Sequence, residues 1–237
     1  MASLAIFGIF GAPFELMKFE LLFDGDLFAS GNRNKHVDEK WEIRKAIEPQ
    51  LVELWNTHPA LSGISLSSQP PRVPHFSITE HPSLLLRRGL EHLETPHEIH
   101  IQSRGATARQ LRTPIVVGDK KFLPLVRKNL SLACKLDITF LRQGKPGDLI
   151  LPGGDLDNRM KTLFDALSIP DQQDLRGNPD HEPFFCLLED DSLIIEQHVK
   201  TGRLLRASSS PSAAHLLIEV SVNVMQITDS NIGFIGD

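Results

Sequence analysis

The chain has 237 residues, of which 41% are hydrophobic and 23% are charged, a composition typical of a soluble globular protein. This length favours one domain with insertions, or one domain with a small appendage. No apolar run approaches the ~18 residues that a membrane helix needs, so we expect a cytoplasmic protein without a membrane partner. Two cysteines, Cys134 and Cys186, cannot supply a four-ligand zinc site, and we expect both to be buried thiols.

Charge is unevenly distributed along the chain. The net charge of -5 argues mildly against a nucleic-acid partner, because binding to phosphates requires clustered lysines and arginines. Residues 102–145, however, hold ten lysines and arginines against two acids, and residues 151–200 hold eleven acids against four bases. A basic stretch beside an acidic one suits a phosphate-binding surface next to a metal pocket, although an ordinary solvated surface explains such charges too.

The N-terminal segment is apolar, and its first basic residue is Lys18, whereas a secretory signal carries basic residues before its apolar run. We interpret residues 1–16 as an upstream extension, with Met17 as the natural start and residues 17–237 as a single domain. A strand is expected at 18–23, and a polar loop follows it at 30–35.

A helix is predicted to begin near Asp38, and Pro49 is expected to break or restart it. Residues from about 57 to 131 are read as a first insertion, with a short helix near 83–93. Residues 135–141 alternate apolar and polar side chains, as a half-buried strand does. Met160, Leu163, Phe164 and Leu167 have the i, i+3, i+4, i+7 spacing of an amphipathic helix.

The remaining elements complete an α/β (α+β) prediction. Residues 169–186 are read as a second insertion, and strands are expected at 192–199 and 215–224. The sequence therefore predicts a mixed sheet of about four strands, covered on one side by helices at 38–56 and 157–167.

Two acidic motifs are the main candidates for chemistry. Asp155 and Asp157 lie at the start of the predicted helix, where a carboxylate could equally serve as a helix cap. Lys161, four residues after Asp157, could form an ordinary exposed ion pair with it or hold a phosphate. Three consecutive acids, Glu189 to Asp191, precede the predicted strand and fit either a solvated turn or a metal site. Carboxylate oxygens are the ligands that Mg²⁺ prefers, and phosphodiester hydrolysis makes use of such an ion.

These motifs resemble a known family. The run DLDN at 155–158, followed by Lys161 and by DAL at 165–167, looks like the core motif of the RusA family. The run EDDSLI at 189–194 is similar to that family's second acidic motif, and SGNR at 30–33 to its N-terminal loop. The resemblance covers residues 17–56, 132–168 and 187–224.

The resemblance implies a homodimeric, RusA-like endodeoxyribonuclease that resolves Holliday (four-way) junctions in DNA recombination and repair. It implies Mg²⁺ as the cofactor, with Mn²⁺ as an alternative, and branched DNA as the partner. Metal ligation falls on Asp155, Asp157 and Asp191, a catalytic or phosphate-contacting role on Lys161, and supporting roles on Asn158 and Asp190. Further candidates for DNA contact are basic residues beside the predicted strands: Arg33, Lys35, Arg142 and Lys145.

Two departures from the family leave alternatives open. The chain is longer than usual for the family because of the two insertions, and it is acidic overall. One alternative is a non-catalytic RusA-like protein that contacts a partner through the insertions. Another is a nuclease that acts on flaps or RNA.

Overall fold

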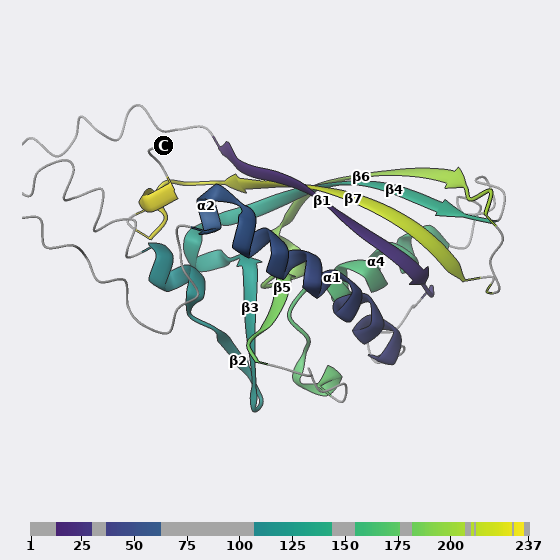
Figure 1. Cartoon of the computed structure of the whole chain (residues 1–237), viewed down its shortest axis with the longest axis horizontal. Coiled ribbons are helices and arrows are strands. Elements are labelled where there is room, and N and C mark those ends of the chain that lie inside the picture. Colours follow the sequence, from purple (N-terminus) through teal and green to yellow (C-terminus); the bar gives the residue numbers. More distant parts are fainter. Residues whose placement is uncertain are drawn as a thin grey trace, which may run out of the picture.

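The chain forms a mixed α+β structure in which two sheets pack with two long helices (Figure 1). The computed structural model describes residues 13–29, 37–62, 107–143, 155–175, 182–206, 210, 212–228 and 230–234. The predicted short helix at 83–93 lies outside these residues. Within the described part, no helix is both long and apolar enough to cross a membrane.

The larger sheet has four strands in the order β1-β7-β4-β6. Their bounds are β1 (Phe14–Asp26), β4 (Leu132–Arg142), β6 (Ile194–Arg203) and β7 (Ala213–Val224). β7 pairs antiparallel with both β1 and β4, whereas β4 and β6 are parallel. All four strands correspond to strands expected from the sequence, but β1 begins at Phe14 instead of Lys18.

One face of this sheet forms the core. Alternate residues of β4 and β7, such as Ile138, Phe140 and Ile218, are fully buried. The helices α1 (Val37–Thr57) and α4 (Asp155–Leu167) cover this face (Figure 1). The opposite face carries partly exposed ion pairs, such as Lys18–Glu219 at 2.7 Å, as is common for an antiparallel sheet with one solvated side.

A second sheet of three strands, in the order β2-β3-β5, was not predicted. It consists of β2 (Ile115–Val117), β3 (Lys120–Val126) and β5 (Phe184–Leu188), so the two regions read as insertions contribute strands to the fold. β2 and β3 form a hairpin whose two-residue turn contains Gly118 at φ +62°, a conformation that favours glycine. β3 and β5 are parallel.

Two short crossings lead from the small sheet to the large one, at adjacent places. β3 leads through the short 3₁₀ helix η2 (Lys128–Leu130) into β4, and β5 leads through η5 (Asp191–Leu193) into β6. Backbone hydrogen bonding joins the two crossings, because Glu189 N donates to Val126 O at 2.9 Å. Smaller elements complete the described part: α2 (Pro59–Ser62), a helical turn at 107–112, η4 (Gln172–Asp174) and η6 (Ile232–Phe234).

The predicted helix break at Pro49 is wrong, because α1 runs without interruption from Val37 to Thr57. Pro49 itself is exposed, while Ile47 and Leu51 on either side of it are buried in the core. Burial of this continuous apolar face outweighs the backbone hydrogen bond that proline cannot donate. The next residue, Gln50, bonds both to the backbone N–H and to the C=O of Leu22, which satisfies part of the free edge of β1.

Two tryptophans and two thiols are buried in the described part of the chain. Trp41 packs edge-on against Phe184, and Trp55 packs edge-on against Phe185, so both tryptophans serve the core. Cys134 and Cys186 are free and buried, as expected.

Candidate active site between α4 and β6

The amphipathic pattern of α4 decides which of its side chains face solvent. Met160, Leu163 and Leu167 are buried in the core, as their spacing predicts. Asp157 and Lys161 lie at the margin of this apolar face and are exposed. The helix begins at Asp155, so Asp157 occupies its first turn, where the helix dipole favours a carboxylate.

The second acidic motif, Glu189 to Asp191, ends in the turn η5, which directly precedes β6. Asp190 caps this turn by accepting the backbone N–H of Ser192 at 2.9 Å, and this hydrogen bond lowers the pKa of Asp190. Glu189 accepts the backbone N–H of Lys128 at 2.9 Å, and the Lys128 ammonium lies 3.5 Å from Asp190. Local donors thus compensate the first two acids, which explains how three consecutive carboxylates are tolerated.

A cavity of about 350 Å³ separates α4 from β6 and brings parts of both acidic motifs together. Its lining comprises Leu156, Asp157, Met160, Lys161 and Phe164 of α4, Asp191 of η5, and Gln197 and Val199 of β6. The helix therefore forms one wall and the edge strand β6 the other. Three residues predicted from the sequence, Asp157, Lys161 and Asp191, share this space.

Within the described part of the chain, Asp157 and Lys161 form no ion pair or hydrogen bond through their side chains. The ordinary i,i+4 ion pair, which was the alternative explanation for their spacing, is therefore not formed. A carboxylate and an ammonium that share a cavity without neutralising each other are both available to a ligand.

The donor atoms in the cavity fit a hard divalent cation, because Asp157 and Asp191 supply carboxylate oxygens. The third predicted ligand, Asp155, is the first residue of α4, but its side chain lies outside the described part. Among the side chains that are described, no three of His, Cys, Asp or Glu form a group that could hold a metal ion. The full three-aspartate set therefore remains a prediction.

The other predicted residues lie elsewhere. Asn158 and Asp190 do not line this cavity, although Asp190 lines a neighbouring one. Arg142 is the last residue of β4, at the end of the large sheet. Arg33, Lys35 and Lys145 are outside the described residues.

Gln197 is a cavity residue that the sequence interpretation missed. Its carboxamide has no hydrogen-bond partner among the described residues, and it lies on the wall opposite α4. Strand alternation places Gln197 on the same face as Val199, but the sequence does not show that this face lines a cavity.

A second cavity of about 270 Å³ adjoins the first, and Asp191 lines both. Its wall includes Lys40, which is almost fully buried and forms ion pairs with Asp174 at 2.6 Å and with Asp165 at 3.8 Å. Arg44, also in this wall, stacks over the Trp41 ring and donates to the backbone carbonyl of Asp165. Lys40 and Arg44 therefore connect α1 to α4 through Asp165. Lys40 also connects α1 to the segment after α4 through Asp174.

No protein-family model, curated protein or solved structure matches the chain.

Proposed function

We propose that this protein is a Mg²⁺-dependent endodeoxyribonuclease of the RusA type, which hydrolyses DNA phosphodiesters and prefers four-way junctions. The observation that supports this function most directly is the cavity in which Asp157 and Lys161, neither of them paired, lie together with Asp191. A phosphodiester carries negative charge, and its hydrolysis needs both a cation and a proton-donating group near the phosphate.

Each charged residue of the cavity has a separate role in the proposal. Asp157 and Asp191, with Asp155 as the third ligand, hold Mg²⁺, which would lower the pKa of the attacking water and stabilise the leaving oxygen. Lys161 donates to a non-bridging phosphate oxygen and compensates the charge that develops during hydrolysis. Because Lys161 and Asp157 are one helical turn apart, α4 positions phosphate and cation side by side.

The location of the cavity suits a polymeric substrate. β6 is at the edge of the four-stranded sheet, so a DNA backbone can approach across its open side. In a homodimer, two such sites related by a twofold axis would cut two strands symmetrically, as junction resolution requires.

The test is cleavage of a labelled four-way junction, a flap and a plain duplex, each with Mg²⁺ and with EDTA. Asp157→Asn is expected to lower the cleavage rate at least about 100-fold, since it removes a proposed metal ligand. Asp38→Asn is a matched control, because Asp38 is also an exposed carboxylate in the first turn of a helix. The control should cleave at the wild-type rate.

The outcomes separate the alternatives. Symmetric, Mg²⁺-dependent junction cleavage that Asp157→Asn abolishes supports a resolvase. Preferential cleavage of flaps supports a nuclease with a different substrate. A folded wild-type chain that cuts none of the DNA substrates would contradict the proposed activity and favour the non-catalytic binding protein.

A further inference from the structure

The cavity-facing side of β6 continues past the cavity to an arginine. Side chains alternate along a strand, so Gln197, Val199, Thr201 and Arg203 share one face of the sheet. Arg203 is the last residue of β6, four residues beyond Val199, which corresponds to about 13 Å at the ~3.3 Å rise of a strand. It is exposed and has no side-chain partner among the described residues.

The neighbouring strand places a second arginine beside it. In the parallel β4–β6 ladder, Ile138 is the partner of Val199 and Arg142 is the partner of Arg203. Arg142 follows the buried residues Ile138 and Phe140 on the same face of β4, so both arginines are on the cavity side of the sheet. Guanidinium groups on two adjacent strands can contact neighbouring phosphates of one nucleic-acid backbone.

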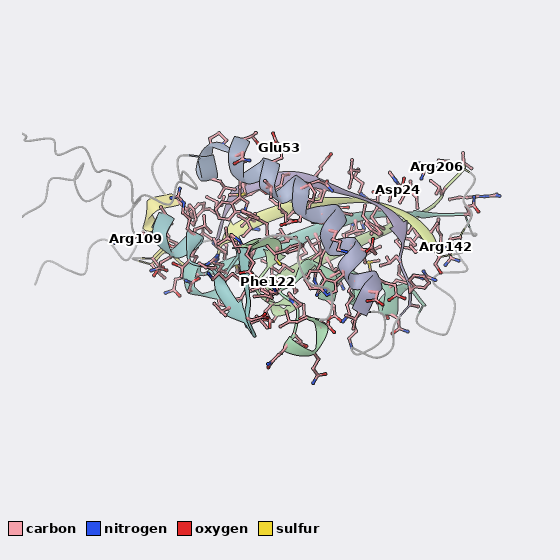
Figure 2. The ribbon with its side chains drawn as sticks, turned by 60° about the horizontal axis from the view of Figure 1, so that its bottom comes forward. Asp24, Glu53, Arg109, Phe122, Arg142 and Arg206 are labelled. Carbon is pink, nitrogen blue, oxygen red and sulfur yellow. The ribbon has the colours of Figure 1, made fainter. Side chains whose placement is uncertain are left out.

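Asp24, an acid at this end of the large sheet, belongs to the other face. Asp24 of β1 alternates with the buried residues Leu21 and Phe23 and forms an ion pair with Arg206. Figure 2 shows Asp24, Arg142 and Arg206 at one end of the molecule, whereas Arg109 is at the opposite end. Arg203 and Arg142 thus form a basic pair on the same face as the cavity, and Asp24 is already engaged on the other face.

We propose that Arg203, together with Arg142, binds backbone phosphates of the DNA strand that flanks the phosphate in the cavity. This inference rests on the proposed nuclease function and adds a contact surface to it. A distance of about 13 Å spans the rise of about four nucleotides along one strand of a duplex, since that rise is ~3.4 Å per nucleotide. Guanidinium groups suit the role, because they bind phosphate with two parallel hydrogen bonds.

The test measures binding without cleavage. All variants carry Asp157→Asn, and fluorescence anisotropy reports their affinity for a labelled four-way junction and a labelled duplex at several salt concentrations. Arg203→Gln is expected to weaken binding of both DNAs about 5- to 20-fold and to reduce the slope of log affinity against log salt by about 1. Arg142→Gln should weaken binding by a similar factor. Arg203→Lys should retain only part of the affinity, because lysine keeps the charge but not the two parallel hydrogen bonds.

Lys200→Gln is the matched control. Lys200 is three residues before Arg203 on the same strand and is exposed, but it lies on the opposite face, 3.6 Å from Asp137. Both substitutions remove one positive charge, so a general charge effect would weaken binding equally. The proposal requires Lys200→Gln to bind within about twofold of its parent.

The results distinguish this inference from the proposed function. If the wild-type chain cleaves DNA but Arg203→Gln and Lys200→Gln bind alike, the arginine contact is wrong and the nuclease stands. If the wild-type chain neither binds nor cleaves DNA, both proposals fall. If polyglutamate at equal charge displaces the DNA as well as an unlabelled duplex does, the arginine pair binds polyanions such as acidic proteins, and the assignment to DNA is overturned.

Discussion

Among the described residues that line the candidate active site, Gln197 alone has an uncharged hydrogen-bonding side chain. It lies on the wall opposite α4, the helix that carries Lys161, and has no partner among the described residues. An amide N–H can donate to a phosphate oxygen without adding charge to the proposed metal site. Gln197 therefore suits the role of a second phosphate donor that assists Lys161.

Substitution of Gln197 tests this role. Gln197→Ala should lower kcat/KM for DNA cleavage about 10-fold, since a hydrogen bond to a charged group contributes ~1.5–3 kcal/mol. Gln197→Glu should lower it further, because a new carboxylate would repel the phosphate. His198→Ala is the control, because His198 is the next residue and is on the other face of β6. Equal kcat/KM in Gln197→Ala and wild type would exclude the contact.

The sequence drew attention to the charged residues that line the cavity but not to their neutral neighbour, for a physical reason. Asp157, Lys161 and Asp191 belong to charged motifs whose spacing can be recognised before any fold is known. Gln197 belongs to a strand in which residues 195–198 are all exposed, so burial alternation does not mark its inner face. Only the position of α4 above β6 identifies the side of the strand that lines the cavity.

At the scale of elements, a buried ion pair fixes the segment after α4 to the start of α1. The Lys40 ammonium and the Asp174 carboxylate are 2.6 Å apart, with 3% and 8% of their side chains exposed. The indole N–H of the adjacent Trp41 donates to the backbone carbonyl of Asp174. These contacts hold η4, and with it one wall of the second cavity, against α1.

Neutralising one partner of this pair should destabilise the fold. Asp174→Asn leaves the Lys40 charge buried with Asp165 at 3.8 Å, and loss of a buried partner typically costs about 3–5 kcal/mol. Urea denaturation measures the change in the free energy of unfolding. Asp171→Asn in the same segment is the control, because Asp171 is exposed and should change stability by less than about 0.5 kcal/mol. Equal stability of the two variants would show that the pair contributes little.

An element could be predicted from the sequence when only one of its faces is buried. α4 and the strands β1, β4 and β7 each bury one face, so their apolar periodicity is visible. In β3, residues 122–126 are all buried, so its apolar run lacks the alternation that marks a half-buried strand. The pair Gly118-Asp119 between two apolar runs was the remaining signal for this hairpin. At Pro49 the rule that proline interrupts a helix led to a wrong prediction, because burial of the apolar face of α1 stabilises the continuous helix.

At the scale of the whole molecule, each of the two sheets contains one buried thiol. Cys134 is in β4 of the large sheet, and Cys186 is in β5 of the small one. Burial raises the pKa of each thiol to about 12. In the unfolded chain both thiols would titrate near the ordinary value of 9.0.

Stability should therefore fall in alkaline solution. Below pH 9 the thiols are protonated in the folded and in the unfolded chain. Between pH 9 and 12 the thiols of the unfolded chain lose their protons, whereas those of the folded chain keep them. The free energy of unfolding should thus decrease by up to about 1.4 kcal/mol per pH unit for each thiol as the pH rises from about 9 toward 12. Urea denaturation at pH 8–10.5 would measure this decrease, with a Cys134→Ala/Cys186→Ala variant as the reference. If the slopes of the variant and the wild type are the same, the thiols do not account for the decrease.

The two adjacent crossings between the sheets affect how long Asp191 stays in the cavity. Asp191 is placed by a turn that begins where β5 ends, and the hydrogen bond from Glu189 to Val126 ties this turn to the neighbouring crossing. A transient opening of the small sheet would release Asp191 from the cavity while α4 and Asp157 stayed in place. Slow amide hydrogen exchange in β3 and β5 would then accompany an assembled site, and a ligand bound at Asp191 would slow exchange in strands that it never touches.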